Sequence, residues 1–448
     1  MSNGGTTGQL VESVVVIDST FANTPIGILT SRIATQSTTA GSLALENVVF
    51  TNSPAAVKGP SSVYLAGNTG TITTNGWVTG DVYSPTGPNK ALSPVSSFIR
   101  PAGLLSGTRY YARSKPQYEN VLSANFMSVR TGGAKGDGVT DDTTAIQNVI
   151  NSATSAGKIV YFDAGIYKVS ATINIGPGAR IVGEAYPVIM ASGSLWNSAT
   201  NPIPVVRVGA ATGQTGVVEW SDMVVSTQGA MAGAVLIQWN LASPATTPSG
   251  MWDVHTRIGG FKGSNLQVAE CPTTGTQPKA ACIAAFQSMR ISNIGTGLYV
   301  ENAWLWTADH DLDDVNNNNT RLSVYSGRGI SVESTTGNIW LVGTAVEHHA
   351  LYQYQLANTQ SIFMGFIQTE TPYYQPSPNA QAPFPVIASR DDPNFAIFCA
   401  GKAASCNIAW GLRVLNSQSV NVYGAGLYSF FNNYDTSKLP SSHPHAVF

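Results

Sequence analysis

The sequence predicts an all-β protein, a right-handed parallel β-helix, and three observations support this prediction. Only 11% of the 448 residues are charged, against about 25% in an average globular domain. The chain has 44 glycines and 24 prolines, and both residue types disfavour helices and favour turns. Short apolar segments also alternate with turns of Asn, Asp or Ser, which is the pattern of short strands joined by tight turns.

These apolar segments recur with a loose period of about 20 to 36 residues, as the coils of a stacked β-structure do. A β-sandwich or a propeller is the alternative, but both need hairpin turns, and only Asn75-Gly76 offers that signal. Strands that are apolar on both flanks of a small polar turn favour parallel stacking. The segments lie at 13–21, 42–53, 216–227, 297–306, 329–343, 354–365 and 411–426.

One segment, residues 133–170, interrupts the repeat with a helical pattern. Asp141 or Asp142 can cap the N-terminus of a helix near 141–156 that has one apolar face, and Gly157 can end it. Carboxylates here could also hold a metal or act in catalysis. We favour a cap that closes the open end of a β-helix.

A cap at this position indicates that a new β-helix begins there. Residues 113–448 are therefore predicted to form a complete β-helix, the second of the chain. Residues 1–112 are predicted to hold the terminal coils of a first β-helix and a linker that includes 85–107, which is rich in Pro, Gly and Ser.

Charge and hydropathy exclude several classes of protein. The formal net charge of −2 does not suit a nucleic-acid-binding protein, which carries a basic stripe or tail. No apolar run approaches the ~20 residues that span a bilayer. The first residues also lack the basic-then-apolar order of a secretory signal. We expect neither nucleic acid nor membrane as a partner, and we expect a monomer.

The four cysteines form two short-range pairs, Cys271 with Cys282 and Cys399 with Cys406. Two small disulfides, formed in an oxidising compartment, fit this spacing. Four free buried thiols are the alternative. Zinc fits less well, because neither pair has two to four residues between its cysteines.

Two neighbouring segments align residue by residue and place two glutamates on one face. Residues 338–347 match 361–370, so that Glu347 falls on Glu370. Equivalent positions of successive coils lie about 4.8 Å apart, and like charges directly opposed destabilise a sheet. Stability alone gives no reason for this pair. One of the two carboxyls should therefore have a raised pKa, as a general acid requires.

Aromatic and ionisable residues surround these two glutamates along the chain. Each aromatic taken singly is more often a packing residue, but rings combined with carboxylates are how proteins hold carbohydrate. The set consists of His348, His349, Tyr352 and Tyr354 after Glu347, of Tyr373 and Tyr374 after Glu370, and of Trp304, Trp306, Asp309 and Asp311 upstream. Their combination indicates a sugar site.

Metal and cofactor motifs fit poorly. Asp309, Asp311 and Asp313 resemble the start of a calcium loop, but its sixth and twelfth positions are Asp314 and Thr320 rather than Gly and Glu. The chain shows no zinc-protease spacing, phosphate-binding loop or nucleophile elbow. We expect no metal and no cofactor.

Several strings carry a family resemblance: GAKGDGVTDDT, GMWDVHTRIGG, VENAWLWTADHDLD, YSGRGISVES, GTAVEHHALYQYQ, FIQTETPYYQP and VYGAGLYSFFNNY. They resemble glycoside hydrolase family 55, which comprises secreted, mainly fungal β-1,3-glucanases with two tandem right-handed β-helices. The first string marks pectate-lyase-like β-helices more generally. The resemblance spans nearly the whole chain.

The resemblance implies an exo-β-1,3-glucanase that cleaves laminarin-type glucan from the non-reducing end with inversion. Glu370, in QTETPYY, matches the general acid, and Glu347, in EHH, matches the glutamate that helps to hold the attacking water. Inversion needs carboxyls about 6.5–9.5 Å apart, so the two side chains should splay. The predicted substrate-binding residues are Trp306, Asp309, Asp311, His348, Tyr352 and Tyr373.

The sequence departs from the family in its first part, since residues 1–112 match only the last coils of the first β-helix. The family's Gln and Ser that position the water therefore have no match here. We expect an extracellular enzyme whose partner is a β-1,3-glucan polysaccharide or oligosaccharide. The alternative is a catalytically impaired carbohydrate-binding remnant. A pectin-cleaving enzyme is less favoured, because a carboxylate-rich site would repel an acidic polymer.

Overall fold

The computed structural model describes residues 2–3, 13–33, 42–84, 87–95, 98–273, 275, 277–317 and 319–436. The chain divides into two compact units, Met1–Tyr111 and Ala112–Phe448. Each unit is described by itself.

The first unit combines parallel coils with antiparallel strands. Ser13 lies opposite Ser42 and Ile26 opposite Ala55, both in parallel pairs 29 residues apart. The pairs β5–β8, β6–β7 and β8–β9 are antiparallel, which the sequence did not lead us to expect. The strands are β1 (Ser2–Asn3), β2 (Ser13–Ile17), β3 (Thr20–Ala22), β4 (Ile26–Thr30), β5 (Ser42–Glu46), β6 (Val48–Lys58), β7 (Val63–Thr74), β8 (Trp77–Ser84), β9 (Gly87–Pro94), β10 (Leu105–Ser106) and β11 (Arg109–Tyr110).

Much of the predicted linker belongs to the first unit and forms secondary structure there. Strand β9 pairs with β8 inside the segment predicted as a linker. Arg100 forms ion pairs with Asp18 and Glu46, with N–O distances of 2.7 Å each. The prediction of a linker over 85–107 is therefore wrong at these residues. The turn Asn75-Gly76 also makes no hairpin, because the strands on either side of it, β7 and β8, pair with other strands.

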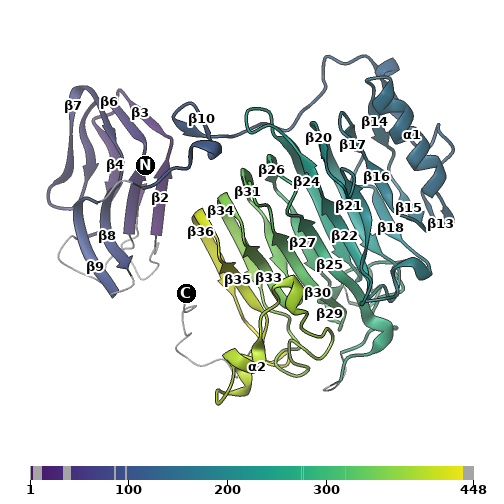
Figure 1. Cartoon of the computed structure of the whole chain (residues 1–448). Helices are drawn as coiled ribbons and strands as arrows, with labels where there is room; N and C mark the ends of the chain where they lie inside the picture. Colours follow the sequence, from purple (N-terminus) through teal and green to yellow (C-terminus); the bar gives the residue numbers. More distant parts are fainter. Residues whose placement is uncertain are drawn as a thin grey trace. The chain divides into compact units, whose positions relative to one another are not determined.

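The second unit is a parallel β-helix, which confirms the predicted fold class (Figure 1). Within the described residues, its strands form a fourteen-stranded and a seven-stranded sheet, and every pair in these two sheets is parallel. Side chains of both sheets fill the space between them as one core that includes Trp220, Trp239, Leu298, Ile339 and Leu356.

The larger sheet consists of β12 (Phe126–Ser128), β13 (Asp137–Asp141), β14 (Ile159–Phe162), β15 (Ile166–Val169), β17 (Arg180–Gly183), β18 (Val188–Ala191), β21 (Glu219–Thr227), β24 (Ser249–Ile258), β26 (Leu298–Glu301), β27 (Trp304–Thr307), β31 (Ile339–Val342), β32 (Ala345–Glu347), β34 (Gln360–Glu370) and β36 (Gln418–Tyr428). The smaller sheet consists of β16 (Ile173–Ile175), β19 (Ile203–Val208), β22 (Ala234–Trp239), β25 (Ile283–Ile291), β30 (Tyr325–Val332), β33 (His349–Ala357) and β35 (Trp410–Leu415). Two small ribbons are β20 (Gln214–Thr215) with β23 (Leu241–Ala242) and β28 (His310–Asp311) with β29 (Thr320–Arg321).

The larger sheet bends once in each coil, at a residue with a positive φ. Asp222, Asp253 and Asn302 hold this place in successive coils, with φ of 60°, 53° and 54°. Aspartate and asparagine tolerate this left-handed conformation better than other residues with a side chain. The bend divides each coil into two strand segments, and the second segment of the later coils carries the predicted site.

Helix α1 (Thr143–Ser155) caps the first coil, as predicted. Its apolar face buries Ile146, Val149 and Ile150 in the core. Gly157, with φ 63°, ends it in the left-handed conformation that glycine adopts most easily. Asp142 occupies the N-cap position, but its carboxylate accepts the backbone N–H groups of Lys135 and Gly136 instead. Within the described part of the chain, no helix has the length and apolar character needed to cross a membrane.

The outer face of the smaller sheet is covered by the loop of residues 371–409, which contains α2 (Phe395–Phe398). Arg328 of β30 forms a buried ion pair with Asp392 of this loop, and Gln355 of β33 donates to the Arg390 carbonyl at 3.0 Å. Strand β33 is therefore buried on both faces. The two disulfides predicted from the cysteine spacing are found: Cys399–Cys406 lies in this loop and Cys271–Cys282 on another.

Candidate active site

Residues on the outer face of the larger sheet form a column across the second strand segments of the last coils. The predicted stack is found, since Glu347 lies opposite Glu370 in adjacent parallel strands and Ile339 lies opposite Ile362. The column continues on both sides of the two glutamates, across β24, β27, β32, β34 and β36. Its members in order are Arg257, Trp306, Glu347, Glu370 and Tyr428.

Glu347 is held by two hydrogen bonds in a buried place. The indole N–H of Trp304 donates to Oε2 and the amide of Gln368 donates to Oε1, both at 2.8 Å. Only 7% of Glu347 is exposed. Burial raises its pKa, and the charges of Glu370 and Asp309 add to this, although His348 and the Trp304 hydrogen bond act in the opposite direction. A raised pKa makes this carboxylate a better proton acceptor.

Glu370 faces a buried histidine that also contacts an aspartate. The distance from His348 Nε2 to Glu370 Oε2 is 3.7 Å, and from His348 Nδ1 to Asp309 Oδ1 it is 3.5 Å. Burial alone would lower the pKa of His348, but its contact with Glu370 and the charges of Asp309 and Glu347 raise it above the usual value. A raised pKa extends the pH range in which the imidazole of His348 is protonated between these carboxylates.

The two glutamate carboxyls have partners in opposite directions along the strands. Gln368 and Trp304 lie two residues before the positions of Glu370 and Trp306 in the column, and they bind Glu347. His348 follows Glu347 in the chain and contacts Glu370. The two carboxyls therefore have different partners even though the backbones are neighbours.

Aromatic rings surround this pair. Trp304 and Trp306 stack with centroids 4.9 Å apart, and the Trp306 indole donates to Asp309 Oδ1 at 3.1 Å. The ring of Tyr373 lies against His348, with centroids 4.9 Å apart, and against Phe431 at 3.7 Å. Of the predicted residues, the structure brings together Glu370, Glu347, Trp306, Asp309, His348 and Tyr373.

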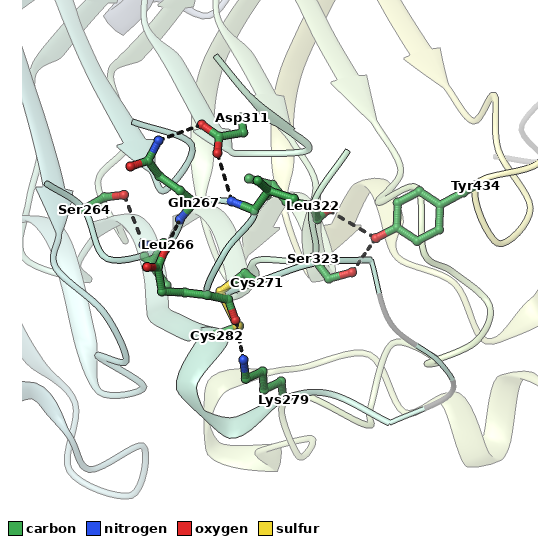
Figure 2. The surroundings of a disulfide bond; sticks show 12 residues. Ser264, Leu266, Gln267, Cys271, Lys279, Cys282, Asp311, Leu322, Ser323 and Tyr434 are labelled. Atoms are coloured by element: carbon green, nitrogen blue, oxygen red, sulfur yellow. Dashed lines mark hydrogen bonds between the residues drawn. A yellow bond between two sulfur atoms is a disulfide. The ribbon is translucent and has the colours of Figure 1, made fainter. Parts of the chain in front are cut away.

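Asp311 points away from this group, contrary to the prediction that it binds substrate. It accepts the side-chain amide of Gln267 at 3.1 Å and the backbone N–H of Val268 at 2.9 Å (Figure 2). It is fully buried. Its carboxylate therefore fastens the loop that leads to the Cys271–Cys282 disulfide to the strand after Asp309, and its role is structural.

Tyr352, also predicted to bind substrate, lies on the other sheet and is not brought together with the two glutamates. It belongs to β33 of the smaller sheet, opposite Arg328 and Trp410. The covering loop buries it, and burial raises its pKa. His349, next to Glu347 in sequence, is buried there too and hydrogen-bonds Ser288 Oγ at 2.7 Å. The turn at His348, with φ 66°, takes the chain from one sheet to the other, which proximity in sequence does not reveal.

Two residues beside the glutamates, Gln368 and Tyr428, are not among the predicted site residues. Gln368 was predictable, because it lies two residues before Glu370 and side chains two residues apart in a strand share a face. Tyr428 was hidden, because the long loop of residues 371–409 separates its coil from that of Glu370. Within the described residues, no three His, Cys, Asp or Glu side chains are arranged to hold a metal ion.

The sequence of residues 126–247 matches a family described as "Rhamnogalacturonase A/epimerase, pectate lyase-like". Over 439 residues the chain is 46% identical to a "Glucan 1,3-beta-glucosidase" of Cochliobolus carbonum, an alignment that covers 97% of this chain and 54% of that relative. Over 339 residues it is 46% identical to a "Probable glucan endo-1,3-beta-glucosidase" of Arthroderma benhamiae, covering 75% of this chain and 38% of the relative.

The chain thus spans about half the length of the first of these relatives and less of the second. Among solved structures, sacteLam55A from Streptomyces sp. SirexAA-E is similar with a TM-score of 0.43 and 17% identity, covering 95% of this chain and 64% of that one. The sequence identity agrees with the resemblance that the motifs carry: over 97% of its length this chain is a homologue of a protein named as a glucan 1,3-beta-glucosidase.

Proposed function

We propose that this chain hydrolyses β-1,3-glucan, releasing glucose from the non-reducing end with inversion at the anomeric carbon. The observation that carries the proposal is the pair Glu347 and Glu370, in register on the outer face and surrounded by aromatic rings. The printed names of the two relatives support β-1,3-glucan as the substrate. The exo mode rests on the motif resemblance.

In this mechanism Glu370 donates its proton to the glycosidic oxygen, and the bond from that oxygen to the anomeric carbon breaks. A water molecule attacks the same carbon from the opposite face of the ring and gives its proton to the Glu347 carboxylate. The separate partners of the two carboxyls support inversion, because water must fit between Glu347 and the sugar. In this scheme Trp306, Asp309 and Tyr373 bind the terminal glucosyl unit that is released as glucose.

The ionised form of Glu347 is the working form in this scheme. Its two hydrogen-bond donors hold the carboxylate while it accepts a proton from water. Because its pKa is raised by burial, it accepts that proton more readily than an ordinary surface glutamate would. Turnover should therefore fall as the pH decreases through this pKa.

The test is glucose release from laminarin by the full chain and by two variants. Glu370→Gln should lose at least 10³-fold in kcat, because the amide cannot donate a proton, while its circular dichroism spectrum is unchanged. The matched control is Glu184→Gln, an exposed glutamate that accepts the backbone N–H of Ala164 in the preceding coil, and it should keep wild-type rates. Proton NMR of the first product should show the α-anomer, as inversion requires.

Two results would contradict the proposal. Near-normal turnover by Glu370→Gln would show that this residue is not the acid. Binding of laminarin by a folded chain that releases no sugar would instead favour the carbohydrate-binding remnant. A β-anomer as the first product would exclude inversion and leave hydrolysis intact.

A further inference from the structure

Two aromatic rings beside Glu370 remain exposed and stacked on each other. Tyr428 and Phe430 have 43% and 41% of their surface exposed. Their ring centroids are 5.1 Å apart and their planes differ by 17°. Exposed apolar rings placed face to face form a flat surface, and the proposed mechanism gives them no role.

Their position relative to the two glutamates is fixed by the sheet register. Tyr428 lies opposite Glu370 on β36, and Glu347 lies opposite Glu370 on the other side. The chain then passes to Phe431, which packs on Tyr373 near His348. The platform of Tyr428 and Phe430 therefore adjoins Glu370 on the side away from Glu347.

A glycine allows the Tyr428 ring to lie on the strand. A Cβ atom added to Gly426 would be 2.7 Å from Cε2 of Tyr428 and 3.0 Å from Cζ, both closer than real Cβ contacts. The ring thus occupies the space above Gly426, two residues back on the same face. The φ of Gly426 is not positive, so its backbone would accept alanine, and the ring would have to move.

We propose that Tyr428 and Phe430 form the binding platform for the glucosyl unit on the leaving-group side of the scissile bond. The proposal rests on the assignment of Glu370 as the acid. Glu370 protonates the glycosidic oxygen that joins the two sugar rings on either side of the scissile bond. Glu347 holds the water that attacks the ring that is released. The next ring of the chain then lies beyond Glu370, against Tyr428. Apolar faces of sugars pack on aromatic rings, and such rings dominate binding energies at ligand sites.

If the platform binds the leaving group, its loss should affect substrates differently according to whether their leaving group is a sugar. Laminaritriose places a glucosyl unit on the platform, whereas β-glucosyl fluoride has one sugar ring and releases fluoride. Loss of the platform should therefore reduce the hydrolysis of laminaritriose much more than that of β-glucosyl fluoride. A residue that merely supports the fold, or the geometry of Glu370, would affect both substrates alike.

The experiment compares kcat/KM for the two substrates in the full chain with Tyr428→Ala, Tyr428→Phe and Gly426→Ala. Tyr428→Ala should lower the value for laminaritriose at least tenfold more than the value for β-glucosyl fluoride. Gly426→Ala, which displaces the ring, should act in the same direction, and Tyr428→Phe should stay within threefold of wild type. Phe398→Ala removes an exposed ring that packs on Trp410 of the smaller sheet and serves as the control.

Equal losses on both substrates, or no loss on either, would overturn the proposal. If Tyr428→Ala does not fold, Phe430→Ala makes the same comparison. If wild type hydrolyses neither substrate, the proposed function fails, and the platform is then judged by the affinity for laminaritriose measured by calorimetry. A dissociation constant at least fivefold weaker in Tyr428→Ala would support the platform, and an unchanged constant would refute it.

Discussion

Glu347 and Glu370 lie directly opposite each other on adjacent parallel strands, yet their carboxyls bind different partners. The sequence predicted a raised pKa for the one of them that acts as the general acid. The raised pKa is instead found at Glu347, the proposed proton acceptor, and burial is its main cause. His348 lies beside the pair, and its protonated form counteracts the repulsion between the two carboxylates. The raised pKa of Glu347 indicates that its ionised form costs the folded protein stability.

Glu347→Gln should make the protein more stable at neutral pH. The pKa of Glu347 is raised in the folded chain, so the folded chain binds the proton of this carboxyl more tightly than the unfolded chain does. The stability of the wild-type fold is therefore greatest below the unfolded pKa, near 4.3. It falls as the pH rises through the folded pKa. The amide does not titrate. The variant should therefore have a melting temperature that exceeds the wild-type value increasingly from pH 4 to pH 7.5.

Calorimetry of both proteins across this pH range measures the difference. Glu184→Gln, which replaces an exposed glutamate, should show almost no change. A variant that melts below wild type at neutral pH would mean that the hydrogen bonds of Glu347 outweigh its burial, and the prediction would fail.

Trp304→Phe should slow turnover more than it weakens binding. The variant keeps a ring to stack on Trp306 but loses the indole N–H that donates to Glu347. A hydrogen bond to a charged group contributes about 1.5–3 kcal/mol, so kcat should fall about 10- to 100-fold. This donor lowers the pKa of Glu347, so the acid limb of the pH–rate profile should also shift to higher pH. An acid limb that stays in place would assign Trp304 a purely structural role.

The register between the coils of residues 338–347 and 361–370 was predictable from sequence, because their apolar positions match in only one alignment of the two segments. The fold class followed from the same repeats, and the helical cap from its apolar face. Tyr352 and Asp311 were misplaced for a physical reason: a single left-handed residue, His348, moves the chain to the other sheet, and a loop hydrogen bond turns Asp311 inward. Neither event leaves a periodic signal. The antiparallel pair β6–β7 was missed because a Gly-Pro-Ser-Ser turn, rather than Asn-Gly, joins its strands.

His348→Asn should weaken the protein mostly at mildly acidic pH. Asparagine tolerates the left-handed backbone of this position. The change removes the charge, and it also removes the contact of Nδ1 with the Thr307 carbonyl, which does not depend on pH in the same way. The pKa of His348 is raised in the folded state, so its charge stabilises the fold below the unfolded pKa of about 6.5 and this contribution is lost as the pH rises through the folded value. The melting temperatures of variant and wild type should differ most near pH 6 and less at alkaline pH. A difference that grows with pH would contradict the ionic role.

The two disulfides should respond differently to a reductant in the folded protein. Cys271 and Cys282 are completely buried, whereas Cys399 is 9% exposed and Cys406 is more so. Thiol–disulfide exchange needs access to a sulfur atom. Mild dithiothreitol should therefore open Cys399–Cys406 first, and iodoacetamide labelling followed by peptide mass spectrometry should find the label on those two cysteines.

The consequences for activity should also differ. Cys399–Cys406 lies in the loop over the smaller sheet, away from Asp309, so its reduction should leave the hydrolysis of laminarin largely intact. The Cys271–Cys282 loop is fastened to Asp311, two residues from Asp309. The double variant with Cys271→Ser and Cys282→Ser should lose about 3 kcal/mol of stability, as short closed loops do, and KM should rise as Asp309 loses its support. Equal labelling of all four cysteines in the folded state, or an unchanged KM in the double variant, would refute this link.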